Sequence, residues 1–212
     1  MKLALYGATG MIGSRLLAEA LDRGHEVTAL VRDPARLTTR HERLSAVVGD
    51  VHDAGSVAAL VAGHDAVISA YGKGPGGDSA TIVAAARSLI DGVRRAAGPR
   101  LLVVGGAGSL HVAPGVQLVD TPDFPAAYKA DALAQRDALE VYRTVTDVDW
   151  TYASPAAVIA PGTRTGTFRT GTDDLVTDAE GNSRISAEDF AIALIDEVEN
   201  PSFRGRRFTA GY

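Results

Sequence analysis

Two patterns of hydrophobic and polar positions alternate along most of the chain. One is a short continuous run rich in Val, Ile, Leu and Ala, which is typical of a strand buried in a parallel sheet. The other places apolar residues every three or four positions, as in an amphipathic helix. The continuous runs predict strands at 2–6, 25–31, 44–48, 65–70, 100–104, 149–153 and 207–210. The spaced patterns predict helices that begin near Ile12, at 54–61, at 80–97, within 124–145 and at 187–199.

Strands alternating with helices predict an α/β fold with a doubly wound parallel sheet, the Rossmann fold. The chain has no internal repeats, low-complexity tracts or linkers, so residues 1–212 are predicted to form a single domain. Segment 154–185 differs, because it is rich in Gly, Thr and Pro and broken into short extended pieces. We expect it to be an insertion over the carboxyl edge of the sheet that forms one wall of a substrate cleft. Ser186 and Asp189 are placed like a capping pair for the last helix.

Three glycines, Gly7, Gly10 and Gly13, lie between the first strand and the first helix. In a dinucleotide-binding turn the first glycine allows the tight turn, the second lets phosphates approach the backbone, and the third lets the helix pack closely on the sheet. The helix then directs its free N–H groups and positive dipole end at a pyrophosphate. A glycine turn alone is weak evidence, but a strand before it and a helix after it favour dinucleotide binding. Thr9, Met11 and Ile12 complete the predicted phosphate-binding turn.

The end of the second strand faces the adenosine ribose in this fold. Arg32 comes first there, and Arg36 follows one helical turn later. A guanidinium matches the geometry of a 2′-phosphate, so the sequence favours NADPH over NADH. Asp33 has two interpretations: it could bind the ribose hydroxyls, or cap the short helix begun by Pro34.

The ends of the later strands supply further candidates for the cofactor site. Asp50 and Val51 follow the third strand, where the aspartate could accept a hydrogen bond from adenine or cap the next helix. Ala70, Tyr71 and Gly72 follow the fourth strand and are predicted to pass the nicotinamide-side ribose. Ser109 ends a glycine-rich turn after the fifth strand. It is predicted to lie near the nicotinamide, or else to bond its own turn.

Composition narrows the chemistry. The chain carries a net charge of −5 with no basic patch, which argues against a nucleic-acid partner. It has no cysteine, so disulfides, thiolate metal sites and cysteine nucleophiles are excluded. Its five histidines are scattered without metal-ligand spacing, and we expect no metal. No apolar run reaches the length of a membrane span and no segment resembles a signal peptide, so we expect a cytoplasmic protein without membrane association.

Several motifs together resemble a known family. They are Gly7–Gly13, Val31-Arg32-Asp33-Pro34, Gly49-Asp50-Val51, Gly105–Leu110, Asp149-Trp150-Thr151, Ser154-Pro155, Pro161-Gly162, Gly181–Ser186 and Asp189-Phe190-Ala191. This set is similar to the atypical short-chain dehydrogenases/reductases, and most to their NADH-flavin reductase branch, which is related to biliverdin reductase B (flavin reductase). The resemblance covers essentially the whole chain. Ser154 and Pro155, at the end of the sixth strand, are accordingly expected beside the cofactor.

The chain departs from the wider superfamily because it has no Tyr-x-x-x-Lys pair. Tyr128 and Lys129 are adjacent, and neighbours on a helix diverge by about 100°, so they cannot both face one substrate. The resemblance implies direct hydride transfer from NADPH to a planar redox-active small molecule, such as a flavin, a quinone or a tetrapyrrole. Ser109 and Tyr128 are the predicted catalytic residues, the first orienting a carboxamide or carbonyl and the second stacking on the acceptor.

Other assignments stay open at this point. Tyr71 and Phe168 could also stack on the acceptor, although each aromatic residue could equally be part of the core. His111 could donate a proton or be an ordinary loop histidine. Two other functions fit the sequence, namely a non-catalytic NADPH-sensing regulator and a pathway-specific carbonyl reductase or isomerase. The sequence carries no signal of an oligomeric state.

Overall fold

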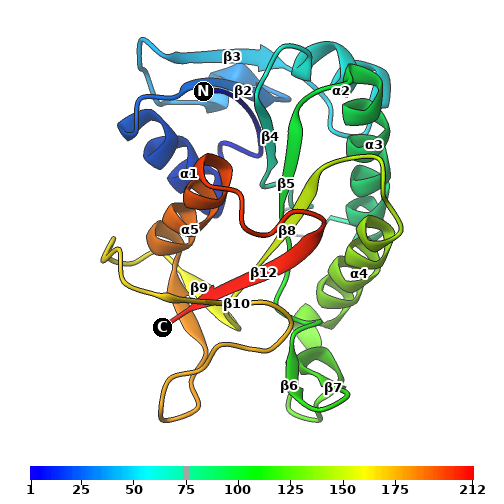
Figure 1. Cartoon of the computed structure of the whole chain (residues 1–212), viewed down its shortest axis with the longest axis vertical. Helices are drawn as coiled ribbons and strands as arrows, with labels where there is room; N and C mark the ends of the chain where they lie inside the picture. Colours follow the sequence, from blue (N-terminus) through cyan, green and yellow to red (C-terminus); the bar gives the residue numbers. More distant parts are fainter. Residues whose placement is uncertain (74–76) are drawn as a thin grey trace.

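An eight-stranded sheet forms the centre of the computed structural model, which describes residues 1–73 and 77–212 (Figure 1). The strand order is β10-β12-β8-β5-β4-β1-β2-β3, and every pairing is parallel except that of β10 with β12. The strands are β1 (Lys2–Tyr6), β2 (Glu26–Val31), β3 (Leu44–Val48), β4 (Ala66–Ser69), β5 (Arg100–Val104), β8 (Trp150–Pro155), β10 (Arg169–Gly171) and β12 (Arg206–Gly211).

Helices cover both faces of this sheet (Figure 1). Helices α1 (Met11–Asp22) and α5 (Ala187–Glu199) pack against each other on one face. Helices α2 (Ala54–Val61), α3 (Ala80–Ala96) and α4 (Ala126–Arg143) cover the other face. Each face has its own apolar core, one containing Leu16 and Phe190, the other Leu89 and Tyr142. The predicted doubly wound α/β sheet is therefore confirmed.

The chain reverses its direction of travel across the sheet between β1 and β4. From β1 it moves outward to β2 and β3, then returns to β4 on the opposite side of β1 and continues to β5, β8 and β12. Ligands of open α/β sheets bind beyond the carboxyl ends of the strands at such a reversal. The topology thus places the predicted site between the ends of β1 and β4.

Some local expectations were wrong in detail. The runs predict strands buried on both faces, but β3 is an edge strand with Ser45, Ala46 and Val48 exposed. The helix expected to reach residue 97 ends at Ala96, because Ala97 adopts a left-handed backbone with φ 52°. Two short 3-10 helices, Pro34–Arg36 and Leu118–Asp120, and a small hairpin of β6 (His111–Ala113) and β7 (Val116–Gln117) complete the connections.

Segment 154–185 is built from pieces of two sheets. Strand β9 (Val158–Ala160) pairs with β11 (Arg184–Ser186), whereas β10 adds an antiparallel edge to the central sheet. The predicted capping pair is half correct: Ser186 Oγ accepts from the Asp189 N–H at 3.0 Å. The Asp189 carboxylate turns away to the loop before β10, where it accepts from the N–H groups of Thr165 and Gly166.

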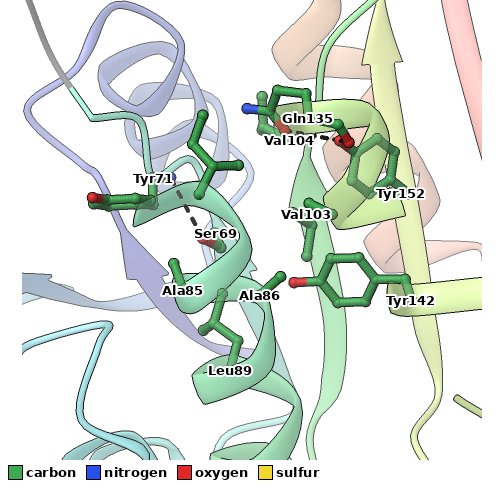
Figure 2. A pocket seen from close by; sticks show the side chains of 12 residues that line it. Ser69, Tyr71, Ala85, Ala86, Leu89, Val103, Val104, Gln135, Tyr142 and Tyr152 are labelled. Atoms are coloured by element: carbon green, nitrogen blue, oxygen red, sulfur yellow. Dashed lines mark hydrogen bonds between the residues drawn. The ribbon is translucent and has the colours of Figure 1, made fainter. Parts of the chain in front are cut away.

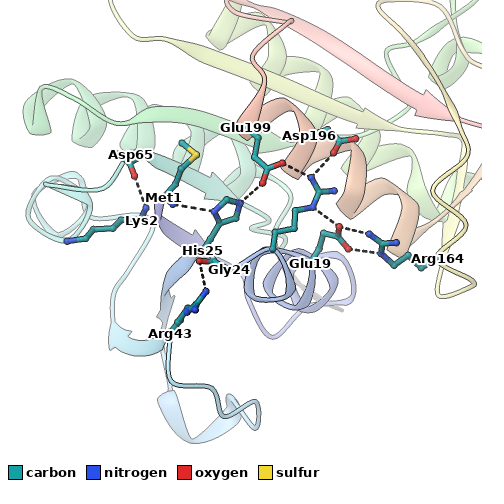
Figure 3. Close-up of polar contacts among 11 residues, drawn as sticks. Met1, Lys2, Glu19, Gly24, His25, Arg43, Asp65, Arg164, Asp196 and Glu199 are labelled. Atoms are coloured by element: carbon teal, nitrogen blue, oxygen red, sulfur yellow. Dashed lines mark hydrogen bonds and ion pairs between the residues drawn. The ribbon is translucent and has the colours of Figure 1, made fainter.

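Buried charge anchors the same loop to α1. Glu19 is almost fully buried, and it accepts from the guanidinium of Arg164 at 2.8 and 2.9 Å and from Arg23 at 2.8 Å (Figure 3). Arg23 also reaches Asp196 and Glu199 on α5, both at 2.7 Å. Hydrogen bonds from Arg164, helped by Arg23, lower the pKa of Glu19 despite its burial. This network joins α1, α5 and the loop before β10.

Candidate cofactor-binding site

A groove of about 1020 Å³ runs across the carboxyl ends of β1 to β5. It contains twelve of the residues that the sequence predicts for the site: Gly7, Thr9, Gly10, Met11, Ile12, Arg32, Arg36, Asp50, Val51, Ala70, Tyr71 and Gly72. Its position at the reversal point between β1 and β4 is where the fold favours a ligand. A groove of this size suits a ligand as large as a dinucleotide.

The three glycines meet different steric demands. Gly7 has φ +80°, and a Cβ there would lie 2.3 Å from the Ala70 carbonyl oxygen. A Cβ at Gly13 would lie 2.0 Å from the Gly7 oxygen, so Gly13 lets α1 pack on the turn and does not itself line the groove. A Cβ at Gly10 would meet only the Gly7 oxygen, at 3.3 Å. Gly7 and Gly13 are therefore required by the protein backbone, whereas the space in front of Gly10 is open to a ligand.

The first turn of α1 faces the groove without a cap. Gly10 occupies the N-cap position and offers no side chain, and the first N–H to bond back is that of Ser14, to the Gly10 oxygen at 2.9 Å. By contrast, Asp53 caps α2 and Ser186 caps α5. The uncapped N–H groups and the positive end of the helix dipole favour an anionic group at this place.

Two arginines mark the end of the groove beside β2. Arg32 and Arg36 are exposed and line the groove, and their guanidinium groups form no hydrogen bond or ion pair with any residue that the structure describes. Asp33 also lines the groove, but its carboxylate accepts from the Ala35 N–H at 3.0 Å and caps the 3-10 helix. The capping interpretation of Asp33 is thus confirmed, and the free cationic groups here are the two guanidinium groups.

Polar contacts order the middle of the groove. Asp50 accepts from the N–H of His52 at 2.9 Å. His52 Nε2 lies 3.0 Å from the hydroxyl of Tyr71, and that hydroxyl donates to Thr81 Oγ1 at 3.1 Å. The imidazole and phenol rings meet edge to face, with centroids 5.1 Å apart. These contacts hold the half-buried ring of Tyr71 at the wall of the groove, below the first turn of α3.

The far end of the groove is formed by Val104, Gly105, Lys73 and Gln135. The Tyr152 hydroxyl donates to the backbone oxygen of Gln135 at 2.9 Å and to its Oε1 at 2.8 Å (Figure 2). A Cβ at Gly105 would lie 1.9 Å from the Tyr152 ring, so only glycine permits this ring beneath the strand end. Lys73 Nζ lies 3.4 Å from Oδ1 of Asp131, which belongs to α4 like Gln135.

Four other predicted site residues do not line the groove. The hydroxyl of Ser109 is buried and accepts from Arg207 Nη1 at 2.8 Å, so it braces a buried arginine. Tyr128 is 65% exposed on α4 and lies outside the groove. Ser154 and Pro155 are buried in β8. Their roles in the sequence-based account therefore have no geometric support from this groove.

Several groove residues escaped the sequence analysis. Gly49 and Gly105 lie in strand-end motifs that it quoted, with no role for Gly49 and only close backbone approach for the glycines of the turn that begins at Gly105. His52 and Lys73 come directly after predicted residues, so the strand-end rule extended by one position would have found them. Gln135 lies within α4, where no motif distinguishes it from the other polar residues of the helix. Tyr6, Leu30, Val31 and Val104 complete the lining as apolar or aromatic strand residues.

Two further features bear on the class of site. In residues 1–73 and 77–212, no group of three or more His, Asp or Glu side chains is placed to hold a metal ion. In the same residues, no helix has both the length and the apolar character to cross a membrane.

The fold and the groove together define a Rossmann-fold dinucleotide-binding protein. The chain belongs to the NAD(P)H-binding family, whose model matches residues 7–201. A solved structure from Burkholderia pseudomallei, described as a "putative exported protein", is 55% identical and matches over 100% of both chains with a TM-score of 0.92. A "putative epimerase" from Bacteroides thetaiotaomicron is 42% identical over 100% of this chain and 96% of its own, with a TM-score of 0.92.

A third solved structure bears on the predicted branch. A "putative NADH-flavin reductase" from Streptococcus pneumoniae is 36% identical over 100% of this chain and 99% of its own, with a TM-score of 0.85. With the family match, it confirms the resemblance to the NADH-flavin reductase branch of the atypical short-chain dehydrogenases/reductases.

Proposed function

We propose that the protein is an NADPH-dependent reductase that transfers hydride to a planar redox-active small molecule. The observation that carries the proposal is that one groove holds both an uncapped helix N-terminus and two arginines whose guanidinium groups have no partner among residues 1–73 and 77–212. The first suits a pyrophosphate and the second a 2′-phosphate, the group that distinguishes NADPH from NADH.

The groove residues fit the parts of the cofactor in order. Arg32 and Arg36 would hold the 2′-phosphate, and the Gly10–Ile12 turn the pyrophosphate. Asp50 and Val51 would face the adenine. The backbone of Ala70 and Gly72 would contact the ribose that carries the nicotinamide. When bound, NADPH supplies the hydride. The chain's own part is then to hold the nicotinamide near Gly105 and to exclude competing reactions.

Direct transfer to a redox-active acceptor is supported by the residues at the nicotinamide end. Tyr128 and Lys129, the one adjacent Tyr-Lys pair, lie on the exposed side of α4, away from the groove. A quinone or flavin accepts hydride and can take its second proton from solvent, so it needs no such acid. The flavin reductase description of the Streptococcus pneumoniae relative agrees with this choice.

The test is a spectrophotometric assay of purified protein with NADPH and a panel of FMN, riboflavin, a naphthoquinone and biliverdin. We expect the absorbance of reduced nicotinamide to fall with at least one of these acceptors, and more slowly with NADH than with NADPH. Tight NADPH binding without oxidation across this panel and a carbonyl panel would instead favour the sensor. Interconversion of a substrate without net NADPH consumption would favour an isomerase, the activity suggested by the name of the Bacteroides thetaiotaomicron relative.

We also retain the cytoplasm as the proposed location, with a small-molecule acceptor as the partner. The Burkholderia pseudomallei relative carries the description "putative exported protein", which makes the location worth testing directly. Fractionation of producing cells should recover the protein with cytoplasmic markers, and recovery in the exported fraction would contradict this assignment.

A further inference from the structure

We propose that Lys73 and Gln135 form a two-donor site for a carbonyl oxygen of the acceptor. The substrates would then be planar carbonyl compounds of the quinone or isoalloxazine class, whose oxygen becomes anionic when they are reduced. This inference rests on the proposed function, because it concerns the acceptor end of the same groove.

The orientation of Gln135 is the first observation. The Tyr152 hydroxyl donates to both oxygens of Gln135, its backbone carbonyl and its Oε1. With the side-chain oxygen held in this way, the amide nitrogen points away from Tyr152 (Figure 2). That nitrogen has no hydrogen-bond partner among the residues that the structure describes. An amide NH₂ carries two donors, so Gln135 presents unused donors where it lines the groove.

The placement of Lys73 is the second observation. Its side chain is only 17% exposed, although lysine side chains are usually solvated. Asp131 Oδ1 lies 3.4 Å from its Nζ and also accepts from Ser79 Oγ at 2.6 Å, so the carboxylate is itself fixed. An ammonium group has three donors, and among residues 1–73 and 77–212 the Lys73 ammonium contacts Asp131 alone, which leaves two donors for a ligand. The groove thus holds a positioned cation at its acceptor end.

The surroundings select a flat acceptor. Val104 and Gly105 line the groove at the end of β5, and the missing side chain of Gly105 makes room for the Tyr152 ring behind it. Tyr152 lies directly behind Gly105 and is fully buried. Val104 and Gly105 thus line the same groove as the two donors, with an apolar side chain and a bare backbone that we take as a floor. A planar ring can lie on that floor while an oxygen at its edge meets Lys73 and Gln135.

The two donors would stabilise the negative charge that develops on the acceptor during hydride transfer. Hydride transfer moves two electrons and one proton from NADPH to the acceptor, leaving NADP⁺ and an acceptor with one extra negative charge. In a quinone that charge lies on a carbonyl oxygen. In a reduced isoalloxazine it lies on ring nitrogen N1 and is shared with the oxygen of the adjacent C2 carbonyl. Solvent then supplies the second proton. Donors aimed at the oxygen that gains charge stabilise the transition state more than the ground state.

Acceptors should differ in how strongly they depend on the two donors, according to where hydride transfer leaves the negative charge. Hydride addition to the central carbon bridge of a tetrapyrrole leaves no anion on an oxygen at the edge of one flat ring. The rate of biliverdin reduction should consequently depend little on Lys73 and Gln135. Of the acceptors named above, a naphthoquinone and the two flavins, FMN and riboflavin, should be preferred.

Activity provides one readout. Lys73→Met and Gln135→Leu should each lower kcat/KM for a naphthoquinone about 10- to 100-fold, the effect of losing a hydrogen bond to a charged group. NADPH affinity, measured by calorimetry, should stay within about twofold. Lys129→Met is the matched control, because it removes the same charge from an exposed position on α4 outside the groove. This control should keep the wild-type kcat/KM.

Binding without turnover provides the second readout. A hydroxynaphthoquinone changes its visible absorbance when its hydroxyl ionises, so its pKa can be measured in a complex with NADP⁺-loaded protein. A cation and an amide donor favour the anion, and the bound pKa should be about one unit lower in wild type than in Lys73→Met. Tyr152→Phe, which releases Gln135, should move the bound pKa part of the way towards the Gln135→Leu value.

The outcomes separate the two proposals. Wild-type protein that oxidises NADPH with none of the acceptors would refute the proposed function and this inference with it. Wild-type protein that reduces a naphthoquinone, while Lys73→Met and Gln135→Leu match it in kcat/KM and in the bound pKa, would overturn the inference alone. Equal losses of kcat/KM with biliverdin and with the naphthoquinone would also overturn it, because the two donors would then not act through a hydrogen bond to a ring carbonyl oxygen.

Discussion

Arg32 and Arg36 are the residues on which the choice between NADPH and NADH depends. Both line the groove, and neither guanidinium group forms a hydrogen bond or ion pair with the described residues. The carboxylate of Asp33, which could have favoured NADH, is used to cap the following 3-10 helix. The local structure therefore leaves two guanidinium groups without partners among the described residues beside the expected ribose position, whereas one oxygen of the Asp33 carboxylate is used in the cap.

The first prediction concerns Arg32. Replacing it with alanine should weaken NADPH binding roughly 10- to 100-fold, because a charge-assisted contact of about 1.5–3 kcal/mol is lost. NADH binding should change little, since NADH has no 2′-phosphate. Calorimetric titration with both cofactors measures this difference. Arg40→Ala is a suitable control, because Arg40 donates to the Leu37 oxygen and lies outside the groove. Equal weakening of both cofactors would contradict the NADPH preference.

The second prediction concerns Ser109, which the sequence placed at the reaction centre. The structure shows its hydroxyl accepting from Arg207, whose side chain is buried and also bonds Asp173 at 2.5 Å. Ser109→Ala should thus lower the free energy of unfolding by about 1–3 kcal/mol, because a buried donor loses its partner. Denaturant titration measures this loss. NADPH affinity should be unchanged, and a Ser109→Ala variant of wild-type stability with strongly reduced turnover would restore the catalytic role.

Ser109 also shows where sequence reasoning stops at this scale. Its position after the fifth strand was read correctly from the glycine-rich turn. Its partner, Arg207, lies 98 positions away in the last strand, and no local pattern reveals that contact. The same holds for Gln135, whose place in the groove depends on a hydroxyl from β8. Residues fixed by strand ends could be predicted, and residues fixed by distant side chains could not.

At the scale of elements, α1 and α5 are joined by charge as well as by apolar packing. Glu19, buried on α1, holds Arg23 on the same helix and Arg164 from the loop before β10 (Figure 3). Arg23 continues the network to Asp196 and Glu199 on α5. The order of the loop at 161–167 thus depends on one carboxylate in α1 and two in α5, Asp189 and Glu188, the latter accepting from the Gly162 N–H at 2.7 Å.

The third prediction follows from the lowered pKa of Glu19. A carboxylate with a depressed pKa in the folded state stabilises the protein above its unfolded pKa and loses that effect as the pH falls through the folded value. Glu19→Gln should therefore lower the free energy of unfolding by about 1–2 kcal/mol near neutral pH. This expected loss is kept small because Arg164 is largely exposed, so solvent screens its attraction to Glu19.

Denaturant titrations at several pH values measure this effect. The difference between wild type and Glu19→Gln should shrink as the pH drops from about 5 towards 3, the range in which glutamate protonates. The control is Glu140→Gln, which removes an exposed ion pair with Arg143 on α4 and should change stability little. A difference that stays constant down to acid pH would show that the Glu19 charge is not what stabilises the network.

The elements themselves could largely be predicted. Helix α2 at 54–61 and helix α5 at 187–199 match the sequence patterns residue for residue, because capping residues and breakers such as Asp53 and Pro201 lie beside them. The edge position of β3 and the antiparallel β10 were not predicted. An apolar run predicts that a segment can form a strand. The position of that strand in the sheet depends on which other strands and helices pack against it.

At the scale of the whole molecule, the parallel sheet gathers its strand ends into one groove. Its phosphate-binding turn, arginine pair and acceptor end come from β1, β2, β4, β5 and α4. The sequence predicted twelve of the lining residues because they follow strands in a fold whose ligand position is fixed by topology. It expected segment 154–185 to form a cleft wall, and no residue of that segment lines the groove. A wall built by a loop depends on tertiary packing that its Gly, Thr and Pro content does not encode.

The most direct test of the account is a calorimetric titration of NADPH into wild type and Gly10→Val. A Cβ at Gly10 would lie 3.3 Å from the Gly7 carbonyl oxygen, a tight contact that a shift of a few tenths of an ångström relieves, so this variant should still fold, with a modestly lower thermal midpoint than wild type. The branched side chain would occupy the space of the pyrophosphate, and NADPH affinity should fall at least about tenfold. Gly13→Val is the contrasting control, because a Cβ there lies 2.0 Å from the Gly7 oxygen and should destabilise the fold itself. A folded Gly10→Val variant that binds NADPH as tightly as wild type would contradict the assignment of the groove to a dinucleotide.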